Sequence, residues 1–145
     1  MESKTGNWYE VKVSYEKQTE SGESKKTAEV YAVDAVSFGD AEKTVFEEVK
    51  QYVDGDVEIL AISKAQYKEV FAKETAQSDE WYKAKLQILT VNERTGDEKK
   101  ESVVYLVQGL SLGDALSGLN GVMDQSALDY VSIGLAKTSI IDVIY

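Results

Sequence analysis

The side chains of this sequence that are most able to do chemistry are its 26 Asp and Glu residues, among 145 residues in total. A pair of carboxylates can hydrolyse a glycosidic bond, and a cluster of them can bind Ca²⁺. Cysteine and histidine are absent, so the sequence has no thiol nucleophile, no imidazole base and no metal site built on either residue. It also lacks a glycine-rich phosphate loop and a nucleophile motif. Most standard catalytic groups are therefore excluded.

The carboxylates that stand out in the sequence are predicted to have structural roles. Asp40 and Asp114 each lie three residues after a serine, where the start of a helix favours an acidic side chain. Glu47 and Glu48 are predicted on an exposed helix face, and Asp54-Gly55-Asp56 reads as a turn too short for a full calcium loop. We expect no catalytic residue, no metal and no cofactor, with an enzyme or small-ligand protein as a further alternative.

The sequence contains an internal repeat, marked by the Trp-Tyr pairs Trp8-Tyr9 and Trp81-Tyr82. Residues 7–15 align with 80–88 at an offset of 73, and residues 22–71 align with 96–145 at an offset of 74, with one insertion in the intervening turn. This self-similarity predicts a tandem duplication.

The repeats are predicted to span residues 1–73 and 74–145, which pack together as one globular unit. Residues 72–79 are polar and without apolar periodicity, so they are expected to connect the repeats.

Each repeat is predicted to begin with a hairpin. Apolar residues alternate with polar ones in residues 9–15 and 82–88, as in a half-buried antiparallel strand. Gly22 and Gly96 supply the positive φ of the turn. The returning strands, 28–34 and 102–108, have apolar residues on both faces, which is typical of a central strand.

A helix and a final strand complete each repeat. Ser37 and Ser111 are the expected helix N-caps. The predicted buried helix faces are Ala41, Val45, Val49 and Tyr52 in the first repeat and Ala115, Leu119, Val122 and Met123 in the second. Gly118 and Gly121 indicate that the second helix is either locally weak or closely packed.

The segments 57–71 and 131–145 are predicted to be long closing strands, each interrupted at most by a bulge. The predicted fold class is therefore α+β, with two tandem ββαβ repeats related by a pseudo-two-fold axis. Each repeat would contribute mostly antiparallel strands and one helix packed on the sheet.

The predicted partner-binding residues are two tryptophans and the lysines near them. Trp8 and Trp81 are expected on the polar face of the first strands, which they would share with Lys12 and Lys85. There they would form an interaction surface. The alternative is that they pack against the second strands or between the repeats. Two lysine pairs beside the hairpin turns complete the set: Lys25, Lys26, Lys99 and Lys100. Their alternative role is to keep the hairpin ends solvated.

The charge of the sequence restricts its partners. Sixteen Lys and Arg residues against 26 Asp and Glu give a net charge of −10, which disfavours nucleic acids and anionic membranes. The polar N-terminus and short apolar runs predict neither a signal peptide nor a membrane span, so a cytoplasmic location is expected.

Four motifs together resemble a known family. They are the Trp-Tyr strand, the G-x-x-K-K hairpin, the segment Val33 to Glu42 and the terminal Tyr67 to Phe71. The pattern is similar to a family of small, uncharacterised proteins of Bacteroidota and their phages, classified as a domain of unknown function. The resemblance covers nearly the whole chain and implies a bacterial or phage cytoplasmic origin, but it brings no activity, cofactor or site residue.

The sequence favours a non-enzymatic binding or adaptor protein that contacts another protein through its duplicated sheet scaffold, as a monomer or homodimer. One alternative is an acidic inhibitor that mimics nucleic acid. Another is single-stranded nucleic-acid binding by the Trp and Lys side chains.

Overall fold

A computed structural model describes residues 1–73 and 80–145. The elements, in chain order, are β1 (Glu2–Lys4), β2 (Trp8–Gln18), β3 (Ser24–Asp34), α1 (Phe38–Lys50), β4 (Glu58–Lys64), β5 (Tyr67–Ala72), β6 (Trp81–Val91), β7 (Glu98–Gln108), α2 (Leu112–Gln125), β8 (Asp129–Lys137) and β9 (Ile140–Ile144). Ala72, the first residue of the predicted connection 72–79, is the last residue of β5. Residues 74–79 of this connection lie outside the described residues.

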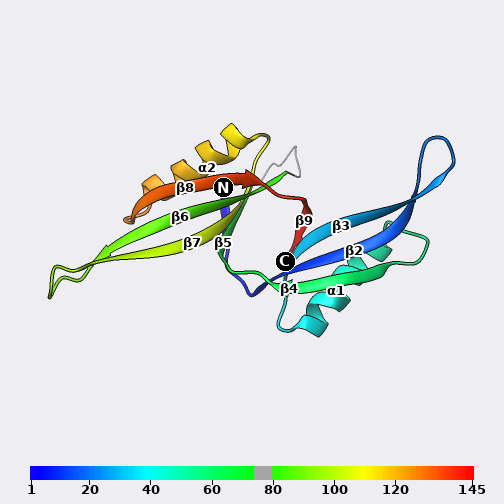
Figure 1. Cartoon of the computed structure of the whole chain (residues 1–145), viewed down its shortest axis with the longest axis horizontal. Coiled ribbons are helices and arrows are strands. Elements are labelled where there is room, and N and C mark those ends of the chain that lie inside the picture. The colour runs from blue at the N-terminus through cyan, green and yellow to red at the C-terminus, as the bar shows by residue number, and fades with distance from the viewer. Residues whose placement is uncertain (74–79) are drawn as a thin grey trace. The chain divides into compact units, whose positions relative to one another are not determined.

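The chain folds into two compact units, and each unit is discontinuous in sequence. Unit 1 comprises Met1–Thr5 and Gln66–Thr138, and unit 2 comprises Gly6–Ala65 and Ser139–Tyr145. The sheet of unit 1 has the order β1-β5-β7-β6-β8, and the sheet of unit 2 has the order β4-β2-β3-β9. Helix α2 packs on the first sheet and α1 on the second (Figure 1).

Both sheets are mixed, with mostly antiparallel strands. Strand β5 runs parallel to β7, and β9 runs parallel to β3, whereas the other described pairings are antiparallel. The α+β class predicted from the sequence is confirmed. Strands β3 and β7 each have a neighbour on both sides, in accord with their apolar residues on both faces.

The hairpins follow from glycine at the turns. Gly22 has a φ of 82° and Gly96 a φ of 73°, a conformation that other residues rarely adopt, as predicted. Strands β2 and β6 have 11 residues each and begin at Trp8 and Trp81. The turn after β6 is one residue longer than the turn after β2. It is closed by a hydrogen bond from Asn92 N–H to the Asp97 carbonyl, whereas the turn after β2 is closed by one from Thr19 N–H to the Glu23 carbonyl. The sequence alignment places its one-residue insertion in the turn after β6.

Both helices begin with the predicted serine caps. The Ser37 side chain accepts a hydrogen bond from Asp40 N–H at 3.0 Å, and the Ser111 side chain accepts one from Asp114 N–H at 3.1 Å. Asp40 in turn accepts from Val36 N–H at 3.0 Å. Backbone N–H groups that would otherwise lack partners at a helix start are thereby satisfied.

Each helix covers a core on one face of its sheet. The buried residues of α1 are Ala41, Val45 and Val49, and those of α2 are Ala115, Leu119 and Met123. Val122 is only partly buried, although it packs against the core of unit 1. Tyr52 was predicted on the buried face of α1, and this is wrong: its side chain is 78% exposed. The helix ends at Lys50, so the helical periodicity no longer places Tyr52 toward the sheet.

Each predicted closing strand is in fact two strands that join different sheets. The segment 57–71 contains β4, which pairs with β2, and β5, which pairs with β7. The segment 131–145 contains most of β8, which pairs with β6, and all of β9, which pairs with β3. The chain leaves one sheet for the other after Ala65 and after Thr138.

The pairing also corrects the predicted alignment by one residue. Ala65 N–H donates to the Trp8 carbonyl, and Thr138 N–H donates to the Trp81 carbonyl, both at 2.9 Å. Ala65 and Thr138, which make equivalent bonds, are 73 residues apart, whereas the predicted alignment of residues 22–71 has an offset of 74. The offset changes between helix and strand, because the helix caps Ser37 and Ser111 are 74 residues apart whereas Ala65 and Thr138 are 73 apart.

The two compact units do not coincide with residues 1–73 and 74–145. Unit 2 takes β9 from the second half of the chain, and unit 1 takes β1 and β5 from the first half. The halves therefore exchange strands.

Two glycines near α2 offer a matched test of packing. A Cβ on Gly109 would lie 2.8 Å from the Cβ and the backbone N of Ala115, whereas a Cβ on Gly121 would meet nothing within 4 Å. We expect Gly109→Ala to lower the free energy of unfolding by about 1–3 kcal/mol through overpacking. Gly121→Ala should raise it by up to about 1 kcal/mol, because alanine favours the helix. Urea denaturation measures both, and a Gly109→Ala protein as stable as wild type would contradict the close approach.

Strand exchange makes a second prediction. Residues 1–73 alone lack β9 beside β3, and residues 74–145 alone lack β5 beside β7. We expect each half, expressed separately, to be largely unfolded, and an equimolar mixture to regain sheet structure as a 1:1 complex. Far-UV circular dichroism and size-exclusion chromatography test this. The exchange would be unimportant for folding if either half alone showed a cooperative unfolding transition.

Candidate binding groove

The structure contradicts the predicted exposure of the two tryptophans. Trp8 is 1% exposed and Trp81 is 3% exposed. Both lie at the start of a strand that has a neighbour on each side, β2 in one sheet and β6 in the other. Buried indoles have no surface to offer to a base or a partner, so packing is the interpretation that fits them.

The predicted lysines are exposed, but they do not gather into one site. Lys12 and Lys85 lie in the middle of β2 and β6, while the pairs Lys25-Lys26 and Lys99-Lys100 lie at the starts of β3 and β7. Partner binding by these lysines stays a prediction.

One groove of unit 2 does combine several chemically distinct side chains. It has a volume of about 610 Å³ and lies between the end of β2 and the loop that joins α1 to β4. Tyr15 and Tyr52 line it together with Glu16, Lys17 and Asp54.

A smaller hollow of about 290 Å³ shares Tyr15, Glu16 and Gly55 with the groove. It is also lined by Ser14 and by Lys26 and Glu58, which form an ion pair at 3.9 Å. Both partners of this pair are largely exposed, so its contribution to stability is small. We call the two hollows together the β2 groove.

The α1–β4 loop forms one wall of the β2 groove. Lys50, in the last turn of α1, donates to the Gly55 carbonyl at 2.7 Å, and Tyr52 N–H donates to the Val49 carbonyl at 3.0 Å. These bonds hold the loop while the Tyr52 ring projects into solvent. An exposed aromatic ring on a tethered loop is a typical recognition residue.

Tyr15 of β2 also lines the groove, and the pKa of its hydroxyl is perturbed. Its pKa is raised to about 12, first by a hydrogen bond to the Glu29 carboxylate and then by burial and the negative charge of Glu29. Burial raises the pKa of the neighbouring Tyr31, and Glu29 adds to the effect. Tyr15 therefore stays neutral near pH 7 and acts as a hydrogen-bonding aromatic surface.

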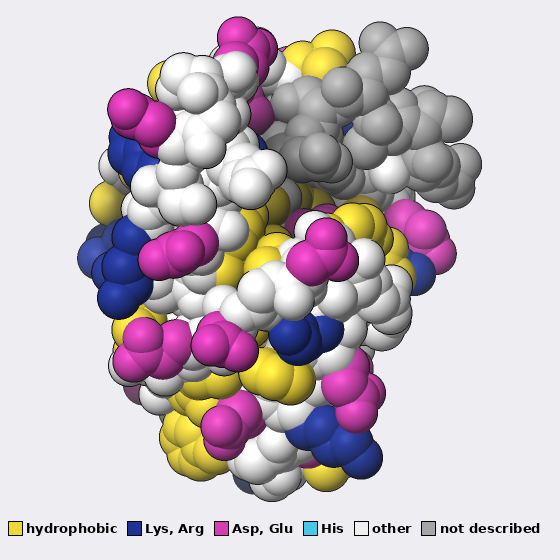
Figure 2. Space-filling view, turned by 90° about the vertical axis from the view of Figure 1, so that its right-hand side faces the viewer, with side chains coloured by type: hydrophobic (Ala, Val, Ile, Leu, Met, Phe, Trp, Pro, Cys, Tyr) yellow, Lys and Arg dark blue, Asp and Glu magenta, His cyan; other side chains and the backbone are white. Residues whose placement is uncertain are grey.

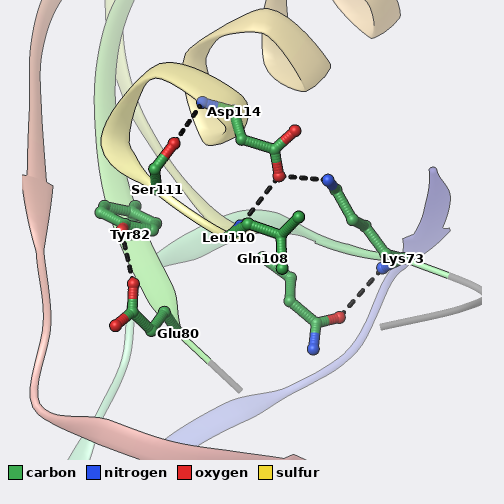
Figure 3. A network of polar contacts seen from close by, with 7 residues as sticks. All are labelled: Lys73, Glu80, Tyr82, Gln108, Leu110, Ser111 and Asp114. Atoms are coloured by element: carbon green, nitrogen blue, oxygen red, sulfur yellow. Dashed lines mark hydrogen bonds and ion pairs between the residues drawn. The ribbon is translucent and has the colours of Figure 1, made fainter. Parts of the chain in front are cut away.

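A polar network surrounds the start of α2 in unit 1 (Figure 3). One carboxylate oxygen of Asp114 accepts from Leu110 N–H at 2.8 Å and from the Lys73 ammonium group. Lys73 N–H donates to the Gln108 side-chain carbonyl at 3.0 Å. The network connects the residue after β5 to the end of β7 and to α2, which is a structural role.

A second polar cluster joins β6 and β8. Glu80 accepts from the Tyr82 hydroxyl and from the Lys137 ammonium group, both at 2.9 Å. Lys137, followed by Tyr82, lowers the pKa of Glu80, and Glu80 raises the pKa of Lys137. The cluster fixes the edge strand β8 to its neighbour and resembles an ordinary surface ion pair.

The surface carries charges of both signs. On the face drawn in Figure 2, acidic side chains are interspersed with Lys or Arg side chains and with small apolar patches. Within residues 1–73 and 80–145, no three acidic side chains are grouped to hold a metal ion. The described helices include none that is long and apolar enough to cross a membrane.

Sequence reasoning missed the β2 groove. The alignment without gaps concealed the longer loop after α1, and the helical pattern assigned Tyr52 to the core. The sequence signal that could have indicated the groove is the run Asp54-Gly55-Asp56, which favours a turn. The corresponding residues of the second half, around Asp129, lie at the start of a strand, so the two halves differ here. Of the predicted lysines, Lys26 lines the groove.

The fold is that of an α+β protein with two mixed sheets, and each sheet contains strands from both halves of the chain. The groove lies beside one of these sheets. The chain belongs to the family described as Domain of unknown function (DUF4494), whose model matches residues 7–145. The expected membership of a domain-of-unknown-function family is thereby confirmed. The chain matches none of the curated proteins and none of the solved structures with which it was compared.

The network of Figure 3 predicts acid sensitivity. The Leu110 N–H, and then Lys73, lower the pKa of Asp114 below its usual 3.8. A lowered pKa stabilises the fold at pH values above 3.8, and this contribution is lost as the pH falls through the lowered value. We expect Asp114→Asn to be less stable than wild type at pH 7 and the difference to shrink toward pH 2. Thermal unfolding across this range tests it, and a difference independent of pH would contradict it.

Proposed function

We propose that this protein is a non-enzymatic binding or adaptor protein that contacts another protein through its sheet scaffold, with the β2 groove as the contact site. The observation that carries the proposal is that an exposed aromatic ring, Tyr52, and a second aromatic residue, Tyr15, both line one groove of about 610 Å³. Aromatic residues dominate protein recognition sites because they bury a large area at little entropic cost.

The chemistry of the groove supports binding over catalysis. Tyr15 has its hydroxyl bonded to Glu29 and a pKa of about 12, so it is neither a base nor a nucleophile near neutral pH. The carboxylates Glu16, Asp54 and Asp56 that line the groove are exposed.

The proposal includes a tandem ββαβ duplication with a pseudo-two-fold relation between the repeats. The two units support it through shared local features, which are a Trp-Tyr strand start, a hairpin glycine with positive φ and a serine helix cap. The α1–β4 loop differs from its counterpart, so one repeat would supply the site and the other the scaffold. We further propose a bacterial or phage source and a cytoplasmic location, on the family resemblance.

The two nucleic-acid alternatives are less well supported. A base-stacking platform needs exposed rings, but Trp8 and Trp81 are buried. A mimic of nucleic acid needs carboxylates in a stripe of one sign, whereas charges are interspersed on the face of Figure 2.

A photocrosslinker in place of Tyr52 tests the proposal. We expect benzoylphenylalanine at this position to crosslink one protein of the native host in stoichiometric yield, because the ring lies at the contact. The matched control places the crosslinker at Leu128, which is 42% exposed in the corresponding loop of unit 1. Mass spectrometry identifies the products.

Two results would overturn the binding function. One is the same crosslinking pattern from both positions, which indicates random collision. The other is retention of single-stranded oligonucleotide in low salt that is lost steeply as salt rises, which would favour a nucleic-acid partner.

A further inference from the structure

Strand β2 has an open edge beside the groove, which its counterpart β6 does not have. Strand β8 covers β6 as far as the pair Leu89 and Asp129. Strand β4 covers β2 only as far as the pair Ser14 and Glu58. Glu16 occupies in β2 the place that Leu89 occupies in β6, because both strands begin at a tryptophan and have 11 residues. Tyr15 and Glu16 of β2 therefore have no neighbouring strand on this side, whereas β8 provides one at the same positions of β6 in unit 1.

The backbone groups at this edge point into the groove. The Trp8 carbonyl accepts from Ala65 N–H, so Trp8 directs its backbone groups away from β3. Backbone direction alternates along an antiparallel strand, and β2 pairs with β3 without a register shift. Ser14, Glu16 and Gln18 therefore have the same outward direction as Trp8. Beyond Ser14, the described residues provide no strand on this side to receive these groups.

The floor of the groove adds a buried polar group. Ser14 is 3% exposed and lines the smaller hollow next to Tyr15. The unpaired strand edge beside Ser14 calls for a polar partner that supplies N–H and C=O groups, which an extended polypeptide does.

The negative charge of the groove favours basic polypeptide segments as partners. Four carboxylates line it, from Glu16, Asp54, Asp56 and Glu58, against two lysines, Lys17 and Lys26. Lys26 is already paired with Glu58 at 3.9 Å. The excess of negative charge beside two tyrosine rings suits Arg or Lys side chains, which combine ion pairing with cation–π contact.

We infer that the β2 groove binds an extended, basic segment of the partner protein, which adds to the edge of β2 as a strand in line with β4. The backbone of the segment pairs with Glu16 and Gln18, and its Arg or Lys side chains reach Tyr52 and Asp54. This inference rests on the proposed function, because it names the chemistry of the partner at the same site.

The test uses a fluorescein-labelled peptide of eight residues in which arginine and valine alternate. We expect it to bind the full chain, and a peptide of alternating glutamate and valine to bind at least about tenfold more weakly. A version with every backbone nitrogen N-methylated keeps the side chains but cannot donate to the strand ladder from either edge. It should also lose about tenfold in affinity. Fluorescence polarisation measures all three.

Protein variants and amide exchange locate the binding. Tyr52→Ser should weaken the arginine peptide about tenfold, whereas Leu128→Ser in unit 1 should leave it unchanged. Circular dichroism shows that both variants fold. Hydrogen exchange at the amides of Glu16 and Gln18 should slow when the peptide binds, because these groups enter a ladder.

The outcomes separate this inference from the proposed function. Equal binding of the N-methylated peptide, or unchanged exchange at Glu16 and Gln18, would overturn strand addition. A crosslinked partner at Tyr52 that contacts the groove through a helical or acidic segment would also overturn the inference, while the proposed function stands. If no peptide binds and the crosslinker at Tyr52 gives no specific product, both the inference and the proposed function are wrong.

Discussion

The rest of the structure depends on parallel pairing between strands from different halves of the chain. The backbone N–H and C=O groups along both edges of β3 and β7 need partners, but a hairpin supplies a neighbour on one edge only, and it is antiparallel. The second neighbours, β9 and β5, come from the other half of the chain and pair in parallel. This constraint explains why each closing segment is divided into two strands, since β4 and β8 remain with their own hairpins while the chain passes on to the other unit.

Local chemistry was sufficient to predict the elements near each turn and cap. A serine followed three residues later by aspartate begins both helices, and a glycine with positive φ closes both hairpins, because these signals act over a few residues. Strand exchange could not be predicted in this way. Whether Ala65 and Gln66 lie within one strand or between two depends on which strand each segment meets, and those partners lie far away in the sequence.

The same distinction separates the site residues that were predicted from those that were not. The lysines are exposed because their long charged side chains favour water wherever they lie on a strand. Trp8 and Trp81 could not be assigned, because alternation places a side chain on one face of a sheet without saying what covers that face. Tyr52 was misassigned because helical periodicity was extended beyond Lys50, where α1 ends.

Strand exchange also sets the order in which the protein can be completed during synthesis. Residues Gly6–Ala65 are synthesised well before Ile140–Ile144, which complete their sheet. Until then the β3 edge, with its apolar Val30 and Ala32, has no parallel neighbour. The nascent chain therefore carries an unpaired strand edge until β9 has been made, and such an edge is open to chaperones or to premature association with another copy.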